Sequence, residues 1–207
     1  MGPLTGIRIV ELAGLGPAPF AGMMLSDMGA EVLRIERVDT SGPGLSQNSN
    51  HDIMARGRRS VAIDLKMAEG VDTALELIDQ ADGLIEGFRP GVMERLGLGW
   101  DVVSKVNPRL IYVQSSAYGS TGPMDGMLSH EWFTQAAAGH ASVSGKNGGL
   151  PQILRGSAHL DWNGAMVNVM GILMALHARE KTGRGLLMQT SQFQSTITAG
   201  FTRWAEF

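Results

Sequence analysis

The sequence predicts an α/β fold: a doubly wound, Rossmann-like and mostly parallel sheet with helices on both faces. Two observations predict it. Short apolar runs rich in β-branched residues recur along the chain, and stretches with helical spacing separate them. Strands and helices that alternate at this spacing form a parallel sheet. Open sheets of this kind bind ligands at the edge where the strands end, here termed the carboxyl edge.

The predicted strands are short apolar runs, as expected for strands buried within a sheet. They are expected at residues 7–12, 31–35, 61–65, 83–85, 110–114 and 186–190. The first helix is expected over residues 17–28. Pro17 and Pro19 are tolerated near a helix start, and Gly29 favours a helix end.

Three further helices are expected from their apolar patterns. Residues 68–80 are amphipathic, and their apolar face contains Val71, Ala74, Leu75 and Ile78. Residues 160–179 are apolar nearly all round, which predicts a buried helix. A last helix is expected over residues 192–207. Residues 38–54 are rich in Ser, Gly, Asn and Asp, and they predict a long loop between two strands.

The composition is that of an ordinary globular protein and argues against several functional classes. The chain has 207 residues, of which 43% are hydrophobic and 18% charged, enough for one large domain with a full core. The net charge of −3 argues against a dedicated nucleic-acid binder. Cysteine is absent, which excludes disulfides and thiolate nucleophiles. The five histidines show no metal-ligand spacing, so no metal site is expected.

The sequence also predicts no membrane partner and a cytoplasmic location. No basic region followed by an apolar run marks a signal peptide. The most apolar stretch, residues 165–176, is shorter than the roughly 20 residues that a bilayer requires. The lack of cysteine is compatible with a reducing compartment.

A strand end, a Pro-Gly turn and a short helix come together at residues 83–99. Phe88 and Arg89 follow the strand directly, which places them at the carboxyl edge of the sheet. Arg95 lies on the next helix, and a guanidinium at such an edge suits a phosphate. On the residues alone, a plain strand–turn–helix connection with solvated arginines is an equal alternative.

The segment Gly14-Leu15-Gly16-Pro17-Ala18-Pro19 partly resembles a dinucleotide-binding fingerprint, with Glu36 as the acidic residue about 20 residues further on. The third glycine is missing, and two prolines replace open backbone amides. The segment therefore predicts a tight turn into the first helix rather than a nicotinamide or flavin site.

Asp161 and His130 each stand at the start of an expected helix. Asp is a preferred helix N-cap residue, which stabilises a helix by about 1 kcal/mol, so a capping role for Asp161 stands beside a functional one. His130, in Ser129-His130-Glu131, is equally compatible with a histidine held by one hydrogen bond.

Six blocks of the sequence, in order, resemble those of the family III CoA-transferases (CaiB/BaiF), which include the α-methylacyl-CoA racemases. They are residues 3–12, 25–37, 56–66, 88–99, 107–112 and 181–185. The resemblance implies a CoA-binding large domain over residues 1–190 and a linker helix over residues 191–207, leading to a small domain. Chains of that family are considerably longer, and two of them interlock as a dimer. A homodimer, or a second subunit that supplies the missing half, is therefore expected, with a fragment, a split subunit and a complete short form left open.

The resemblance also implies that coenzyme A, or an acyl-CoA, is bound as a substrate and that no cofactor is tightly bound. The positions that match CoA contacts of the family are Arg37, Ile63, Lys66, Phe88, Arg95 and Tyr118. Ile63 and Phe88 would flank the adenine, and the cations would meet the phosphates. A solvated basic surface is the alternative, and we favour it for Arg58 and Arg59.

By the same resemblance, Asp161 matches the nucleophile of the transferases, and its attack on a thioester gives a mixed anhydride that CoA thiolate reopens. The helix N-terminus would stabilise the carboxylate, and Gly164 would let the thioester approach. Racemases use the same position as an acid/base, together with a histidine at the position of His130. Transfer of CoA between an acyl-CoA and a carboxylic acid is the leading expectation. Racemisation of a 2-methylacyl-CoA and an inactive or regulatory CoA-binding subunit are the alternatives.

Overall fold

The computed structural model describes residues 2–39, 52–143, 148–150 and 159–200. In these residues six strands form one sheet in the order β3-β2-β1-β4-β5-β6, and every pair is parallel. The strands are β1 (Arg8–Leu12), β2 (Glu31–Glu36), β3 (Arg59–Ala62), β4 (Gly83–Glu86), β5 (Ile111–Ser116) and β6 (Leu186–Ser191). The predicted doubly wound α/β fold is confirmed.

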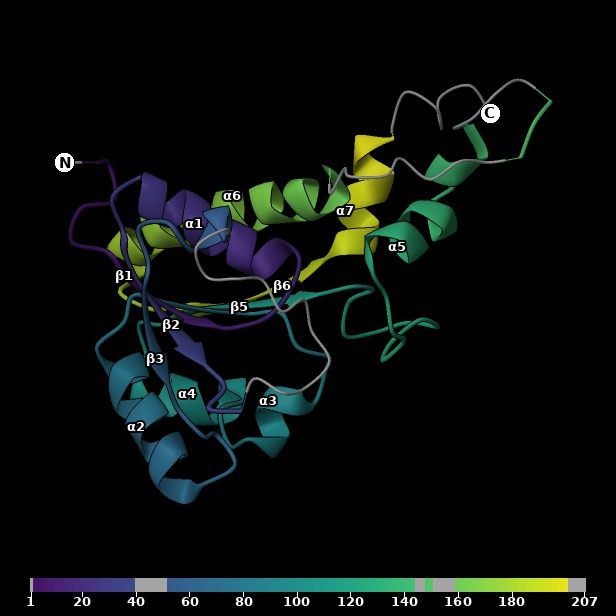
Figure 1. Ribbon diagram of the computed structural model, residues 1–207. Coiled ribbons are helices and arrows are strands. Elements are labelled where there is room, and N and C mark those ends of the chain that lie inside the picture. The colour runs from purple at the N-terminus through teal and green to yellow at the C-terminus, as the bar shows by residue number, and fades with distance from the viewer. Residues whose placement is uncertain (1, 40–51, 144–147, 151–158, 201–207) are drawn as a thin grey trace.

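Helices cover both faces of the sheet (Figure 1). One face carries α1 (Pro17–Asp27) and α6 (His159–Thr182), which pack against each other. The other carries α2 (Ala68–Asp79), α3 (Val92–Arg95) and α4 (Trp100–Val106). Beyond the carboxyl edge, α7 (Gln192–Ala199) packs against both α6 and α5 (Glu131–Ala137).

An apolar layer on each face holds the sheet between its helices. Successive strand residues point to opposite faces, so Ile9 packs into the layer of α1 and α6 while its neighbour Val10 packs into the layer of α2 and α4. The central strands are apolar on both sides because both sides are covered.

The connection between β5 and β6 has an unusual hand. The crossovers β1–α1–β2 and β4–α3–α4–β5 run in opposite directions along the sheet on opposite faces, so they share one hand. The β5–β6 crossover runs in the same direction as β4–β5, yet α6 lies on the α1 face. Its hand is therefore the opposite one, against a strong general preference. As a result, the first turn of α6 lies beside α1, near the middle of the sheet.

The predicted strand at residues 61–65 is shifted in the structure. The strand β3 runs from Arg59 to Ala62, and its last residue pairs with Glu36, the last residue of β2. It is an edge strand, paired on one side only and exposed along its length. Its extent is set by β2 rather than by its own apolar pattern.

The predicted buried helix at residues 160–179 is α6, but the prediction of burial all round is wrong. Four large apolar side chains of this helix are exposed: Trp162, Met170, Leu173 and Met174. Met174 exposes 69% of its surface. The helix contacts α1 and the sheet along one side only. An apolar pattern on its own does not reveal how many neighbours a helix has.

The remaining predicted elements differ at their ends. The region after the Pro-Gly turn forms two helices, α3 and α4, where one was expected. The last helix begins at Gln192 as predicted and ends at Ala199, and residues 201–207 lie outside the described residues, as do residues 40–51 of the predicted loop. A short 3-10 helix, Ile53–Ala55, overlaps the end of that predicted loop. The domain boundary near residue 190 stays a prediction.

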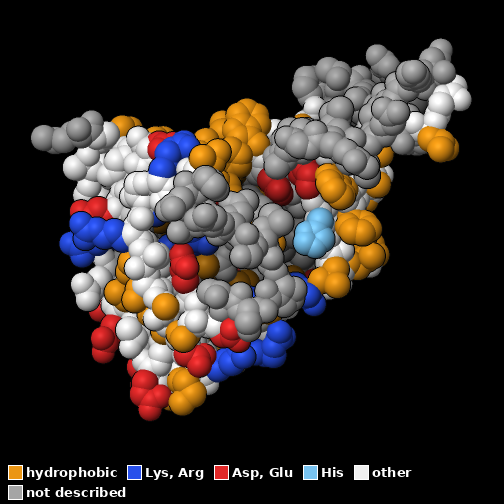
Figure 2. All heavy atoms as spheres, viewed as in Figure 1, with side chains coloured by type: hydrophobic (Ala, Val, Ile, Leu, Met, Phe, Trp, Pro, Cys, Tyr) orange, Lys and Arg blue, Asp and Glu red, His pale blue; other side chains and the backbone are white. Residues whose placement is uncertain are grey.

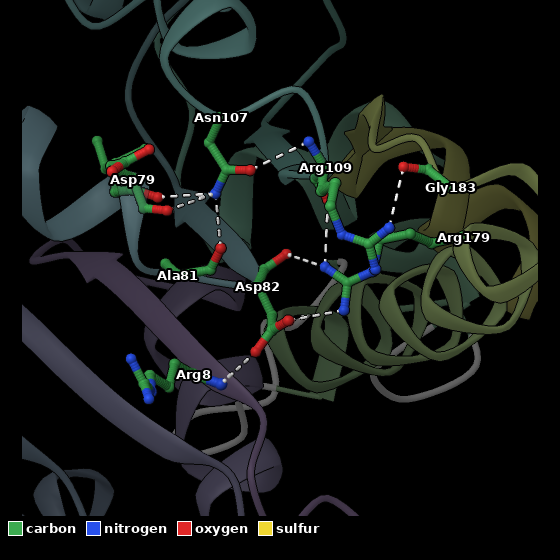
Figure 3. A network of polar contacts seen from close by, with 9 residues as sticks. Arg8, Asp79, Ala81, Asp82, Asn107, Arg109, Arg179 and Gly183 are labelled. Carbon is green, nitrogen blue, oxygen red and sulfur yellow. Dashed lines mark hydrogen bonds and ion pairs between the residues drawn. The ribbon is translucent and has the colours of Figure 1, made fainter.

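A polar network closes the amino edge of the sheet, opposite the carboxyl edge (Figure 3). Arg179 of α6 donates to Asp82 Oδ1 at 2.7 Å and to the main-chain oxygens of Asp82 and Arg109. The backbone N–H of Arg8 donates to Asp82 Oδ2 at 2.9 Å. Asn107 donates to three carbonyls at the end of α2 and beyond it. The network ties the end of α6 to the loops that precede β4 and β5.

Candidate active site

The structure brings the predicted CoA-binding residues to one edge of the sheet. Arg37 follows β2, Ile63 and Lys66 follow β3, Phe88 follows β4 and Tyr118 follows β5. Arg95, on α3, comes shortly after Phe88. Because all six strands are parallel, all these segments leave the sheet at its carboxyl edge.

The exposure of these residues differs. Arg37, Lys66 and Arg95 are exposed, as a contact to a phosphate in solution requires. Ile63 is 9% exposed and belongs to the apolar layer under α2, so little of its side chain is open to a ligand. Its predicted place beside an adenine is therefore the weakest of the set.

Phe88 and Tyr118 are half-buried on neighbouring loops. The backbone N–H of Phe88 donates to Glu86 Oε2 at 2.6 Å, which fixes the start of the loop after β4. The ring of Tyr118 packs against Phe193 of α7, with centroids 5.7 Å apart. Both side chains line hollows in the surface at this edge.

Two adjoining hollows open at the carboxyl ends of β4 and β5. They share the lining residues Phe88, Arg89, Pro90 and Ser116. One extends over α3 to Glu94, and the other extends towards α5 as far as Ser129. Together they form a surface groove from α3 to the segment just before His130. Strand order reverses between β1 and β4, and ligands of open sheets bind near such a point.

Asp161 lies in the first turn of α6, and its carboxylate is held by a side chain from the end of the sheet. Gln192 follows β6 directly, and its Nε2 donates to Asp161 Oδ1. The other end of the same amide, Oε1, accepts from Thr134 Oγ1 of α5 at 3.3 Å. The orientation of Gln192 is thus set from both ends, and through it that of Asp161.

The N-terminus of α6 is capped by Glu131 rather than by Asp161. Glu131 Oε1 accepts from the backbone N–H of Leu160 at 3.1 Å, and Oε2 accepts from that of Asp161 at 3.0 Å. These are the backbone donors that an N-cap side chain satisfies. The predicted capping alternative for Asp161 is therefore wrong, because its own carboxylate faces Gln192 instead.

Two glycines shape the space around Asp161. Gly16, with φ +82°, precedes α1, and a Cβ built there would lie 3.1 Å from Asp161 Oδ1. Gly164 lies one turn further along α6, where a Cβ would come within 3.0 Å of the ring of Pro17. Gly164 therefore serves the close packing of α6 on α1, whereas Gly16 lets the backbone approach the carboxylate.

The pKa of Asp161 is raised to about 6: burial and, less strongly, the negative charge of Glu131 raise it, and the hydrogen bond from Gln192 opposes both. At neutral pH the carboxylate is ionised but close to its protonated form. A pKa in this range suits a nucleophile as well as an acid/base group.

His130 is exposed and immediately precedes α5. Its neighbour Glu131 reaches the first turn of α6, so the two predicted catalytic residues stand on segments joined by hydrogen bonds. Figure 2 shows hydrophobic side chains gathered beside a histidine on this part of the surface. The exposed apolar residues of α5 and the segment before it are Met127, Leu128, Trp132 and Phe133.

The predicted surface role of Arg58 is wrong. Its side chain is 2% exposed and forms an ion pair with Glu11 of β1, which is fully buried. It also donates to the carbonyl oxygen of Pro19 in α1 at 3.1 Å. Burial raises the pKa of Glu11, and Arg58 opposes that shift. Arg59 is exposed, as expected.

Sequence reasoning missed Glu131, Gln192 and Thr134 as site residues. Gln192 carried a usable signal, because it follows a predicted strand and so belongs to the carboxyl edge. Glu131 and Thr134 carried none, because their roles depend on the contact between α5, α6 and α7.

The described residues hold no group of three or more His, Asp or Glu side chains arranged to bind a metal ion. In the same part of the chain, no helix is both long and apolar enough to cross a membrane.

Comparison with known proteins identifies the class to which this fold and site belong. The model of the CoA-transferase family III matches residues 4–205. The chain therefore belongs to the CoA-transferase family III, as its sequence blocks predicted.

Both branches of the family occur among the similar proteins. The chain is 37% identical to the alpha-methylacyl-CoA racemase of Mus musculus, over 97% of this chain and 51% of the relative. It is 35% identical to the acetyl-CoA:oxalate CoA-transferase of Acetobacter aceti, over 95% and 52%. The chain thus spans about half the length of the curated relatives it matches.

Solved structures agree with the fold. The crystal structure of the hypothetical protein Rv3272 from Mycobacterium tuberculosis superposes with a TM-score of 0.90 at 31% identity, over 99% of this chain and 58% of that one. A CAIB/BAIF family protein from Brucella suis superposes with a TM-score of 0.86 at 29% identity, over 95% and 55%.

Proposed function

We propose that this chain carries the CoA-binding edge and the nucleophile of a CoA-transferase that moves CoA between an acyl-CoA and a carboxylic acid. The observation that carries the proposal is the carboxylate of Asp161. It stands in the first turn of α6, beside the Gly16 backbone, and it is oriented by Gln192. The curated relatives include an acetyl-CoA:oxalate CoA-transferase, whose name states this kind of reaction.

In the proposed reaction an oxygen of Asp161 attacks the thioester carbonyl, and the carbon–sulfur bond breaks to release CoA thiolate. The resulting mixed anhydride is attacked by the thiolate at the aspartyl carbonyl, which frees the first carboxylic acid and leaves an aspartyl thioester. The acceptor acid then takes CoA by the same two steps in reverse. The partial positive charge at the start of α6 favours the ionised form of Asp161 that begins and ends the cycle.

Racemisation is the second candidate, and one observation favours it. His130 stands next to Glu131, which binds the first turn of α6, so an exposed histidine and Asp161 lie on joined segments. Two such groups on opposite sides of an α-carbon would exchange its proton. The similarity to the mouse racemase is as strong as that to the transferases.

Chemical trapping separates the two candidates. The purified protein is incubated with a reactive acyl-CoA and then with hydroxylamine or borohydride, and the modified peptide is located by mass spectrometry. We expect the label on Asp161 and none in Asp161→Asn, because only a covalent intermediate can be trapped. Deuterium exchange at the α-carbon without an adduct would instead support the racemase, and neither result in an active protein would contradict both.

CoA binding at the carboxyl edge has its own test. Arg95→Ala should weaken CoA binding by roughly 1–3 kcal/mol, the scale of a charge-assisted hydrogen bond. Arg59→Ala is the matched control, since Arg59 is an exposed arginine on β3 that we assign no contact. Calorimetry that finds the same affinity in both variants would remove Arg95 from the site.

A further inference from the structure

A polar contact is buried where α6 lies against β5 and β6, within the apolar layer on that face of the sheet. Asn168 of α6 is fully buried. Its Nδ2 donates to Ser115 Oγ of β5 at 2.9 Å, and its Oδ1 accepts from Thr190 Oγ1 of β6 at 2.6 Å. Ser115 and Thr190 are register partners, so one amide bridges two neighbouring strands. Both ends of this amide are therefore used within the protein.

The rest of the buried face of α6 offers no such direction. Among the described residues of α6, the buried polar side chains are Asn168 and, at the amino edge, Arg179 (Figure 3). The other buried side chains of the helix are apolar, namely Leu160, Ala165, Val169, Ile172 and Ala175. Apolar contacts have no preferred direction, whereas hydrogen bonds do. A single buried asparagine is known to set the register of packed helices in this way.

The same two elements meet again at the candidate site. Asp161 lies about two helical turns before Asn168 and so on the same side of α6. Gln192 follows β6 just after Thr190. The helix runs from the carboxyl edge to the amino edge and β6 runs back, so the Asn168–Thr190 and Asp161–Gln192 hydrogen bonds join them in succession. A shift of α6 that separates the first pair would also separate the second.

We propose that Asn168 is a positioning residue that orients Asp161 for attack on the thioester, because it holds the first turns of α6 in register with β5 and β6. The inference rests on the proposed function, since Asp161 is the proposed nucleophile. Asn168 is closed to solvent and acts through α6 and Gln192 rather than on a ligand. Small displacements of a reacting group are enough to slow a reaction strongly.

The test replaces the polar contact with apolar side chains of similar shape, in a triple variant that combines Asn168→Leu, Ser115→Ala and Thr190→Val. Asn168→Leu alone would leave both hydroxyl groups without their partner, which is destabilising. Removal of all three polar groups together is nearly neutral for stability, so the denaturation midpoint should stay close to that of the unchanged protein. Val169→Ala is the matched control, because it removes only apolar packing from the next residue of α6.

Two quantities are measured: the rate at which the adduct forms on Asp161 in a single turnover, and the affinity for CoA by calorimetry. The triple variant should form the adduct roughly tenfold more slowly and bind CoA with unchanged affinity, because the predicted CoA contacts lie on other segments. Val169→Ala should lower the denaturation midpoint and keep the rate. Thr190→Val alone breaks one bond at a half-buried position and should slow the step roughly threefold.

A second measurement tests the route through Gln192. Gln192→Leu removes the hydrogen bond to Asp161, so the three replacements should slow adduct formation no further in that background. A further tenfold loss there would overturn this route.

An unchanged rate in the triple variant and in Thr190→Val, or a loss in Val169→Ala as large as that in the triple variant, would also overturn the inference while the proposed function stands. If the unchanged protein forms no adduct, the proposed function falls, and this inference falls with it.

Discussion

The two edges of the sheet both carry polar side chains, but they differ in whether the acidic groups have a cationic partner. At the amino edge, Asp82 is surrounded by donors: the guanidinium of Arg179 binds one oxygen and the backbone of Arg8 binds the other (Figure 3). At the carboxyl edge, Glu86 and Asp161 are acids without an ion pair in the described residues, and the pKa of each is raised by burial.

This difference separates polar groups that stabilise the fold from polar groups that can act on a ligand. A buried charge whose hydrogen bonds are all made within the protein stabilises the fold and has no donor or acceptor free for a ligand. A buried acid with a raised pKa is held in a costly state, and such groups concentrate at functional sites. The hollows also open beside Glu86 and not beside Asp82.

The largest expected effect comes from breaking the amino edge. Arg179→Leu should lower the free energy of unfolding by about 2–3 kcal/mol, somewhat less than for a fully buried pair because Asp82 keeps part of its access to water. Denaturant unfolding measures it. Arg56→Leu, which breaks the exposed pair with Asp27, should leave the midpoint unchanged. CoA binding by the folded fraction should survive both changes. Its selective loss in Arg179→Leu would contradict the view that the amino edge stabilises the fold without taking part in binding.

A pair of glycines gives a sharper comparison within the candidate site. Gly16 and Gly6 both have positive φ, and only Gly16 faces a neighbour, Asp161. Gly16→Ala and Gly6→Ala should each lose about 1 kcal/mol of stability from backbone strain. Only Gly16→Ala should also slow the covalent step, roughly tenfold, because the new methyl group displaces the carboxylate. Equal rates in the two variants, measured by single-turnover trapping, would show that the contact has no role.

The smallest expected effect concerns pH. Activity that needs ionised Asp161 is full above its pKa and is lost as the pH falls through about 6. Glu131→Gln removes a negative charge that raises this pKa, so the acid limb of kcat/KM should move to lower pH by up to about 1 unit. Glu131→Asp keeps the charge and should keep the limb in place. An unmoved limb in Glu131→Gln would mean that Glu131 acts only as a helix cap.

The periodic features of this fold were predictable from sequence, and its long-range contacts were not. Apolar runs predicted the strands, and the end of one of them placed Phe88 and Arg89 at the carboxyl edge of the sheet. The extent of β3 depended on its neighbour β2, and the exposed side of α6 depended on what lies beside it. Arg58 and Glu11 are 47 positions apart in the sequence, and no local pattern predicts their ion pair. The contact of Glu131 with α6 is of the same kind, across 30 positions.

The bond between Gln192 and Asp161 joins residues 31 positions apart, and nearly all of the chain between them is α6 and β6. This hydrogen bond therefore closes a long loop of the chain. It can form only after β6 has paired in the sheet, so the entropy cost of closing the loop precedes the orientation of the carboxylate. The proposed nucleophile would then be among the last parts of the domain to reach its final position. A change that weakens the pairing of β6 in the sheet would therefore disturb the orientation of Asp161 without contacting it.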